Sequence, residues 1–239
     1  MNINQFTRSE MVMGQEGLEK LKASTVAVFG VGGVGSFSVE ALARVGVGHL
    51  VLVDFDTVDI TNVNRQLHAF PDTVGMSKVA LMEKHVKRIQ PDIKVTVYEM
   101  KYNAETAPQI FDPTWDYVID AIDMVSSKLD LIQRCWENNV PIISSMGTGN
   151  KMDPSKFEII DISKTHMCPL AKVMRKELKA RGVKKLNVCF SPEKPVKPLS
   201  LDQNSDNPRK QTPGSMPFVP SVAGMICASK AVRDIIGWK

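Results

Sequence analysis

The stretch Thr25 to Ser36, TVAVFGVGGVGS, decides the fold. A run with the composition of a buried strand leads directly into the glycine loop, and an apolar helix is predicted from Ser36 to about Val45. In the pattern G-x-G-x-x-G, glycines permit a tight turn and let backbone N–H groups approach a phosphate, while the dipole of the following helix favours the anion. The predicted nucleotide-binding loop comprises Gly30, Gly32, Gly33, Gly35 and Ser36.

An acidic residue at the end of the next predicted strand strengthens this prediction. Asp54 ends the run His49 to Asp54 and follows Gly30 by 24 positions, where a carboxylate can accept hydrogen bonds from ribose hydroxyls. The alternative is a glycine-rich turn that only packs a helix on a strand, and the joint presence of strand, glycines, helix and acid disfavours it. These features alone leave open whether a dinucleotide or a mononucleotide binds.

Short apolar runs and amphipathic segments alternate on both sides of the glycine loop. This rhythm, between residues 25 and 145, is typical of an α/β fold with a Rossmann-like, doubly wound and mostly parallel sheet. From Ser77 to Gln90 apolar residues recur every three or four positions, which predicts a helix that covers the sheet. The predicted strands are Thr25 to Phe29, His49 to Asp54, Ile93 to Glu99, Tyr117 to Ala121, Pro141 to Ser145, Phe157 to Ile162 and Leu186 to Phe190.

Polar residues after the second strand favour a triphosphate over a nicotinamide cofactor. A hydride-transfer site seldom needs the run DFDTVDITNVNRQ, whereas an arginine fork and a lysine neutralise phosphate charge in a transition state. Arg65 and Lys78 are the candidates, and either could instead be a solvated surface cation. The polar candidates beside them are Asp56, Asp59, Asn62, Asn64 and Gln66.

The fourth predicted strand ends in Asp120-Ala121-Ile122-Asp123, which places two carboxylates at the edge where α/β sheets bind ligands. Asp123 is the predicted ligand of a Mg²⁺ ion that carries the ATP phosphates, because such an ion takes one or two carboxylate oxygens and keeps its waters. Asp120 is assigned to the strand end beside the nucleotide. The alternative is that one of the two only caps the next helix, since Asp is a favoured N-cap residue.

The combination GVGGVGS, VDFDTVDITNVNRQ, GMSK and DAID resembles the ATP-dependent adenylating family of ubiquitin-activating (E1-like) enzymes over about residues 6 to 150. Arg8, in FTRSE, resembles the family's arginine that reaches the phosphates of the neighbouring protomer, which implies a functional homodimer. The resemblance implies an ATP site formed by Gly32, Gly35, Asp54, Asp56, Asn64, Arg65, Lys78 and Asp123.

The four cysteines bear on which member of the family this is. Family members that activate sulfur-carrier proteins hold zinc with two C-x-x-C pairs, and this chain has none, so neither a cysteine-only zinc site nor a disulfide framework is indicated. Cys168 or Cys189 could serve as a nucleophile, although an isolated cysteine is more often a buried apolar residue. Activation of a ubiquitin-like sulfur carrier stays open as an alternative, as does a nucleotide-binding or NAD-dependent module without adenylation.

The carboxyl-terminal half, with FEIIDISKTHMCPLAKVMRKELKARGV and PGSMPFVPSVAGMICASKAV, resembles one branch of this family, the tRNA threonylcarbamoyladenosine dehydratases. The resemblance implies an ATP-dependent enzyme of the ligase type that activates the carboxylate of the threonylcarbamoyl group on adenosine 37 of tRNA as an acyl adenylate. An internal atom of the modification then closes a ring with loss of AMP. Proteins of a cysteine-desulfurase sulfur relay are possible further partners.

Charge is concentrated in one segment of the chain. The net charge is +4, but residues 164 to 197 contain ten Lys or Arg against two Glu, which fits a tRNA substrate because phosphate neutralisation needs clustered cations. The alternative is a basic helix that is only solvated on one face. Phe190 and His166 are the nearby candidates for base stacking, so no stacking surface is predicted.

These features predict two regions, an ATP-binding adenylation domain at residues 1–150 and a smaller basic tRNA lobe at residues 151–239. Within the lobe, Pro169 to Ala180 is predicted to be helical, and the proline-rich stretch 192–217 to be a mobile loop. A final helix from Ser221 to Ile236 is expected to pack back on the core through Val222, Met225, Ile226, Ser229 and Val232. No signal peptide or membrane span is predicted, so a cytoplasmic protein is expected.

Overall fold

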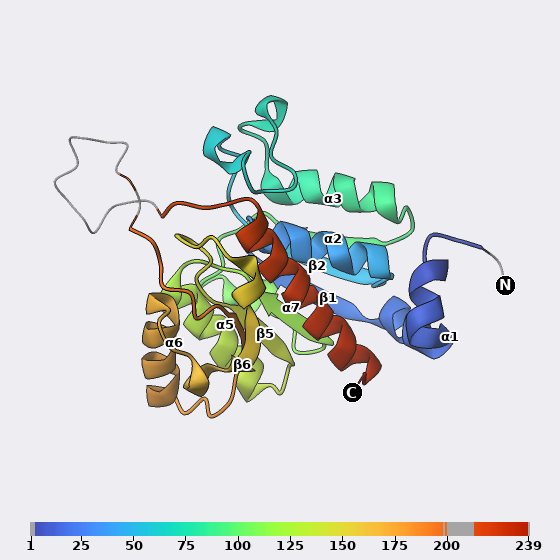
Figure 1. Cartoon of the computed structure of the whole chain (residues 1–239). Coiled ribbons are helices and arrows are strands. Elements are labelled where there is room, and N and C mark those ends of the chain that lie inside the picture. Colours follow the sequence, from blue (N-terminus) through green and yellow to red (C-terminus); the bar gives the residue numbers. More distant parts are fainter. Residues whose placement is uncertain (1–2, 198, 200–212, 239) are drawn as a thin grey trace.

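A computed structural model describes residues 3–197, 199 and 213–238. Its centre is one seven-stranded sheet with the order β3-β2-β1-β4-β5-β7-β6, parallel throughout except for the antiparallel pair β6 and β7 (Figure 1). The predicted doubly wound α/β fold is confirmed, and its first five strands have the Rossmann order. The strands are β1 Thr25–Phe29, β2 His49–Val53, β3 Lys94–Tyr98, β4 Tyr117–Asp120, β5 Ile142–Ser145, β6 Glu158–Asp161 and β7 Asn187–Phe190.

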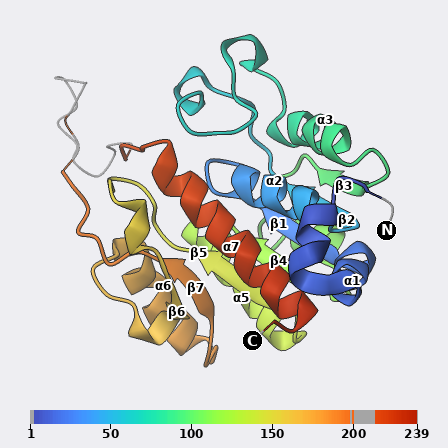
Figure 2. The same cartoon turned by 45° about the vertical axis from the view of Figure 1, so that its right-hand side comes forward.

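One face of the sheet is covered by helices from both ends of the chain. There α2 Gly35–Val45 and α3 Lys78–Ile89 lie on the first strands, while α7 Phe218–Ile236 runs across the sheet beside α2 (Figure 2). The helix α1 Thr7–Ala23 contacts α2 and α7. Apolar residues of these helices and of the strands beneath them form the first core cluster, which the fully buried Leu42, Leu50, Met82 and Ile119 exemplify.

The opposite face carries α4 Ala107–Ile110, α5 Val125–Glu137 and α6 Pro169–Ala180. One cluster joins Phe29 and Val118 to α4 and α5, and another joins α5 and α6 to Val188 of β7. Residues after position 150 therefore extend the same sheet, because β6, β7 and α6 pack continuously on β5 and α5. Single-turn 3₁₀ helices span Ile60–Asn62, Pro71–Thr73, Pro154–Lys156 and Ile162–Lys164.

The C-terminal helix packs on the sheet, but its buried face differs from the predicted one. Met225 and Ser229 are exposed, and the buried residues are mostly small. Gly224 explains this, because a Cβ there would stand 2.2 Å from the carbonyl oxygen of Val34, so α2 and α7 approach backbone to backbone. Ser38 Oγ donates to the carbonyl oxygen of Gly224 over 2.9 Å across this contact. The buried residues of α7 are Val219, Pro220, Ala223, Gly224, Cys227, Ala228 and Ala231.

Two further segments bear on the sequence predictions. The helix α1 was not predicted, because only Gly17, Leu18 and Leu21 of its residues are buried. Of the predicted mobile loop 192–217, positions 198 and 200–212 lie outside the described residues, and the described positions up to 216 form neither helix nor strand. No described helix is long and apolar enough to cross a membrane.

Candidate active site

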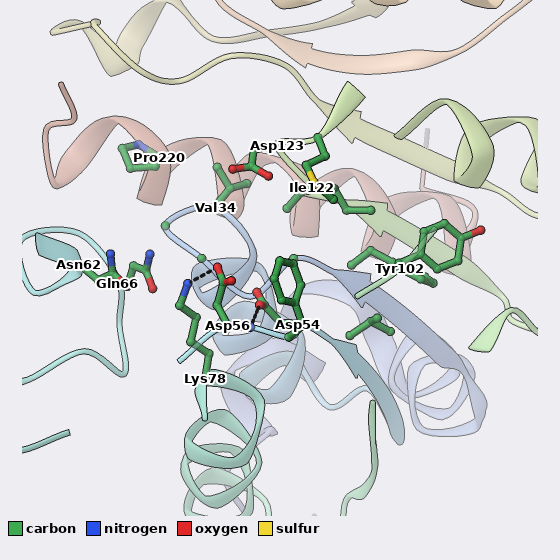
Figure 3. A pocket seen from close by; sticks show the side chains of 18 of the residues that line it. Val34, Asp54, Asp56, Asn62, Gln66, Lys78, Tyr102, Ile122, Asp123 and Pro220 are labelled. Carbon is green, nitrogen blue, oxygen red and sulfur yellow. Dashed lines mark hydrogen bonds and ion pairs between the residues drawn. The ribbon is translucent and has the colours of Figure 1, made fainter. Parts of the chain in front are cut away.

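A cavity of about 320 Å³ opens where the carboxyl ends of β1, β2 and β4 meet. This is the point where the strand order reverses, at which doubly wound sheets bind their ligands. Figure 3 shows Lys78 and Asp56 on one side of the cavity and Asp123 on the other. Ten of the residues singled out in the sequence line it: Gly30, Gly32, Gly33, Asp54, Asp56, Asn62, Arg65, Gln66, Lys78 and Asp123.

The glycine loop needs its glycines for two different reasons. Gly30 has a φ of 82°, and a Cβ there would stand 2.6 Å from the carbonyl oxygen of Ala121. Gly35 does not line the cavity, and a Cβ there would stand 1.8 Å from the carbonyl oxygen of Gly30, so it closes the turn. Gly32 and Gly33 face the cavity, and no other described residue accepts from their N–H groups. Such a loop is a concavity suited to an anion.

Asp54 joins the glycine loop to the end of β2. Its Oδ2 accepts from the N–H of Val31 over 2.6 Å, and its Oδ1 accepts from the N–H of Asp56 over 2.9 Å. Burial raises the pKa of Asp54, and these two N–H groups together with Lys78 act in the opposite direction. The carboxylate therefore fixes the loop and still borders the cavity.

Lys78 is a buried cation at the first position of α3. Its side chain is 6% exposed, and its Nζ lies 2.8 Å from Oδ2 of Asp56, whose side chain is 49% exposed. Ser77 caps the helix by accepting from the N–H of Ala80. The lysine is thus held at the cavity wall by one carboxylate, and no other described side chain accepts from its remaining hydrogens, so they can bind a second anion.

Arg65 enters the cavity from the loop that follows β2. Its Nη1 donates to the carbonyl oxygen of Thr61 over 2.7 Å and to Oδ1 of Asn64 over 3.0 Å. Asn64 itself does not line the cavity, because its Nδ2 donates to the carbonyl oxygen of Ser215 over 2.9 Å. Asn64 therefore orients Arg65 and ties this loop to the segment before α7.

Asp120 does not line the cavity, in contrast to its predicted place beside the nucleotide. It is wholly buried, its Oδ2 lies 2.9 Å from Nζ of the equally buried Lys128, and Ser144 Oγ donates to the same oxygen over 2.6 Å. Its Oδ1 accepts from the N–H of Ile122 over 3.1 Å, which holds the turn that leads to Asp123. Asp120 is therefore a structural residue beneath the site.

Asp123 is the carboxylate that the cavity exposes at this strand end. It makes no hydrogen bond or ion pair with another described residue, and it does not cap α5, whose N-cap residue Met124 provides no side-chain cap. Two other predicted residues lie elsewhere. Ser36 is buried and its Oγ accepts from the N–H of Leu67, while Arg8 is exposed on α1 outside the cavity lining.

Several lining residues were not predicted from the sequence. Phe55 is half-exposed, with Nζ of Lys101 5.9 Å from its ring centre, and its position between Asp54 and Asp56 was the available signal. Tyr102 lies at the cavity edge and donates to Oδ2 of Asp130 over 2.8 Å. Ser215 and Pro220 come from the segment before α7 and its first turn, and nothing local in the sequence connects them to the loop at Gly33.

Two buried polar side chains near Lys78 lack partners in the described part of the chain. Gln66 lines the cavity, and its Oε1 accepts no hydrogen bond. His68 is 5% exposed, and neither ring nitrogen has a partner. Burial, followed by the charges of Lys78 and His85, lowers the pKa of His68 to about 4. His68 is therefore neutral near pH 7 and adds no positive charge beside Lys78.

The cysteines stand apart from this cavity. All four are buried, and none lines it, which disfavours Cys168 and Cys189 as nucleophiles of this site. Among residues 3–197, 199 and 213–238, no group of three or more His, Cys, Asp or Glu side chains could hold a metal ion. The groups that line the cavity include cations, carboxylates and backbone N–H groups.

Comparisons with known proteins agree with this geometry. The tRNA threonylcarbamoyladenosine dehydratase of Bacillus subtilis is 50% identical over 242 residues, which cover 98% of this chain and 95% of that protein. The crystal structure of the Escherichia coli tRNA N6-threonylcarbamoyladenosine dehydratase in complex with ATP superposes with a TM-score of 0.89 at 33% identity and covers 98% of this chain and 94% of that one.

A relative with another activity matches a shorter part of the chain. The molybdopterin-synthase adenylyltransferase of Haemophilus influenzae is 36% identical over 129 residues, which cover 54% of this chain and 53% of that protein. The sequence profile of the ThiF family matches residues 6–239, almost the whole chain. The chain therefore belongs to the ThiF family.

Proposed function

We propose that this protein is an ATP-dependent tRNA threonylcarbamoyladenosine dehydratase that cyclises the threonylcarbamoyl group on adenosine 37 of tRNA. The observation that carries the proposal is the cavity at the carboxyl ends of β1, β2 and β4, which combines a phosphate-binding loop, two cations and a free carboxylate. The comparisons add support, because relatives that match 98% of this chain are tRNA threonylcarbamoyladenosine dehydratases.

ATP would bind with its phosphates along the glycine loop and its ribose near Asp54. The N–H groups of Gly32 and Gly33 lack other acceptors in the described chain, and the start of α2 adds the positive end of its dipole. Arg65, whose Cγ lies 3.4 Å from the position of a Cβ on Gly33, and Lys78 also line the cavity, where they would neutralise the phosphate oxygens. Asp56 holds Lys78 until the more highly charged polyphosphate competes for the ammonium group.

The residues present fit one magnesium ion. Asp123 is exposed to the cavity with no partner in the described chain, and a Mg²⁺ ion that carries phosphates needs one or two carboxylates besides its waters. When bound, the ion would supply positive charge at the phosphate oxygens. Asp123 would hold it, and the ion pair of Asp120 with Lys128 keeps Asp123 in place through Ile122.

The chemistry follows from these charges. The substrate carboxylate attacks the α-phosphorus, the bond to the bridging oxygen of the β-phosphate breaks, and pyrophosphate leaves. Two anions must meet, so Arg65 and Lys78 lower the barrier by neutralising charge in the transition state. An atom of the same modification then attacks the acyl carbon, and AMP leaves with one carboxylate oxygen. Ring closure within one substituent gains from proximity, so no cysteine is required.

A second protomer would complete the site. Arg8 is exposed on α1 and lies outside the cavity of its own chain, where it would be free to reach the phosphates of a neighbour. Met11 and Val12 on the same helix are more than two-thirds exposed, which supplies apolar surface for a homodimer. An arginine supplied in trans contributes about 10³ to 10⁵ in rate in related phosphoryl chemistry.

The tRNA would lie along α6. Lys172, Lys176 and Lys179 are exposed on this helix at a spacing of three and four, so they share one face. Arg175 is tied to Thr165, to whose carbonyl oxygen it donates over 2.6 Å. A row of free ammonium groups suits phosphates that follow one another along an RNA backbone.

Mass spectrometry of tRNA nucleosides tests the proposal directly. Purified protein with ATP, Mg²⁺ and tRNA carrying the linear modification should yield a nucleoside lighter by one water, together with AMP and pyrophosphate. No sulfur donor should be needed, which also tests whether sulfur-relay proteins are partners. The second candidate is activation of a sulfur-carrier protein, because an adenylyltransferase matches about half of the chain. Pyrophosphate exchange that depends on a carrier protein ending in Gly-Gly, with no change in the tRNA, would favour this alternative.

A further inference from the structure

A second cavity of about 260 Å³ lies at the other end of the sheet from the ATP cavity. It opens between the first residues of β5 and β7, Ile142 and Asn187, and the end of α5. Its walls are mostly apolar, with Trp136, Pro141, Val183 and Leu186 among the lining residues. None of them belongs to the ATP cavity, so this groove has no role in the chemistry described above.

Trp136 is the aromatic side chain of this groove. It lies in the last turn of α5 and is 41% exposed, whereas Trp115 is buried and packs against Phe29 and Phe111. Phe190, a candidate for base stacking in the sequence, is fully buried beneath His166 and cannot receive a base. Trp136 therefore offers an aromatic surface at a place where the sequence predicted none.

Cations surround the groove. Lys185 lines it, and Lys184 and Arg181 are exposed in the same loop. Nη1 of Arg181 donates to Oε1 of Gln133 over 3.0 Å, which brings the end of α6 against α5 next to Trp136.

Three acids face this region from the neighbouring elements, and one of them, Asp130, is paired with a cation. Glu137 accepts from Nε2 of Gln133 over 2.8 Å, and Asp130 is paired with Arg134. Asp161 of β6 accepts from the N–H of Leu186 over 3.2 Å, and Lys185 contributes to the lowering of its pKa. Glu137 and Asp161 keep their negative charges, but the three cations Arg181, Lys184 and Lys185 outnumber them, so the balance of charge around the groove is positive and suits a polyanion.

Helix α6 connects this groove with the ATP cavity. At its start, Sγ of Cys168 lies 3.5 Å from the position of a Cβ on Gly147, whose neighbour Thr148 lines the ATP cavity. At its end, Arg181 contacts α5 beside the groove. The twelve residues of α6 span about 18 Å at 1.5 Å per residue, a distance that an RNA stem-loop covers easily.

We infer that this groove binds an unpaired base of the tRNA, stacked on Trp136, with the adjoining phosphates on Lys185 and Lys184. The inference rests on the proposed function for the identity of the RNA. It adds a second contact that lies at the far end of α6 from the reacting nucleoside. An apolar groove with an aromatic wall and a cationic rim is the arrangement by which proteins hold single-stranded nucleotides without reading their sequence.

The test uses the full-length protein and an in vitro tRNA transcript. In a Trp238→Phe background, which removes the other exposed tryptophan, RNA should quench the emission of Trp136 saturably, and Trp136→Phe should abolish that change. Trp136→Ala should raise the Kd for tRNA by about 5- to 160-fold, the range for loss of one stacked base. Trp136→Phe should keep affinity within about threefold, because its ring still stacks.

Three results separate this inference from its alternatives. In the dehydration assay Trp136→Ala should raise KM for tRNA and leave kcat and the Kd for ATP unchanged, whereas an equal loss of ATP affinity would show an effect on the whole fold and overturn the inference. Normal tRNA affinity in Trp136→Ala with intact dehydration would overturn the groove and leave the proposed function standing. Quenching by RNA in a protein that dehydrates no tRNA would support the groove and reject the function.

Discussion

Oδ2 of Asp120 lies 2.9 Å from Nζ of Lys128, and neither side chain has any exposed surface. Three further hydrogen bonds complete the pair, from Ser144 and the N–H of Ile122 to Asp120, and from Lys128 to the carbonyl oxygen of Ser145 over 2.9 Å. A buried ion pair is stable only with such additional partners, because both ions have lost their hydration. Through the hydrogen bond from Ile122, the pair fixes the turn that carries Asp123 into the cavity.

Removing one member of this pair should destabilise the protein strongly. Lys128→Met leaves the Asp120 carboxylate buried without a counter-charge, which costs about 3–5 kcal/mol. Denaturation by urea, followed by circular dichroism, measures this cost. The double variant Asp120→Asn with Lys128→Met serves as the control and should recover most of the loss, since no charge stays buried. A single variant as stable as the original protein would contradict the interpretation.

Arg65 and Asp123 should be needed for turnover and not for folding. Arg65→Ala and Asp123→Ala each remove a charge at the cavity wall, so we expect dehydration to fall by about 10³-fold, in line with an arginine at a phosphoryl centre. Melting should stay cooperative, with a change in unfolding free energy near 1 kcal/mol at most. Arg65→Lys is the matched control, because it keeps the charge but loses the fork of donors. If these variants unfolded, both residues would belong to the scaffold.

Two glycines of the same loop should respond differently to alanine. In Gly35→Ala the new methyl group would stand 1.8 Å from the carbonyl oxygen of Gly30, so we expect little folded protein. In Gly32→Ala the nearest atom, Nε2 of Gln66, is 3.6 Å away, which is ordinary contact. This variant should fold and lose ATP affinity, because the methyl group occupies space at the phosphate-binding loop. A thermal melt of each variant measures folding, and calorimetric titration with ATP measures affinity. If both variants unfolded, or if both folded and bound ATP equally well, the two glycines would not have the separate roles assigned to them.

His68 should make the protein less stable in mild acid. Its pKa is about 4 in the folded chain against an ordinary value of 6.5. Between these values the unfolded chain binds more protons, so stability falls as the pH is lowered, by about 2 kcal/mol from pH 7 to pH 5 for this one group. His68→Leu should remove that part of the pH dependence. Urea denaturation of both proteins at the two pH values measures it, and an identical slope would exclude the buried neutral histidine as the cause.

The parts of the site that depend on local sequence were predictable. The glycine loop and Asp54 follow the ends of two predicted strands, and Lys78 begins a predicted helix. Parallel strands bring their carboxyl ends together, so these residues were expected at one edge of the sheet. The sequence placed Asp120 beside the nucleotide because its actual partner, Lys128, lies on another element, and the pairing is visible only in the folded chain. A signal existed, since Lys128 lies on the same helix face as Leu131, Ile132 and Cys135, all buried. A lysine within a buried apolar stripe needs buried acceptors, and an acid is one such partner.

Contacts between distant segments were not predictable from one sequence. The buried face of α7 consists of small residues because backbone meets backbone at Gly224, and periodicity of large apolar residues does not report such a contact. Trp136 was not associated with the basic segment because α5 and the loop after α6 become neighbours only in the folded chain. The helix α1 carries too few buried residues to give a clear periodic signal.

The close crossing of α2 and α7 determines when the protein can first act. Ser38 and Gly224 are bonded across 186 positions of sequence, and Pro220 beside Gly33 supplies one wall of the nucleotide cavity. Ribosomes add about 5–20 residues per second, so roughly 10 to 40 s pass between synthesis of the loop and synthesis of that wall. A nascent chain therefore cannot complete its nucleotide cavity until α7 has been synthesised, so nucleotide binding reports that this helix has docked.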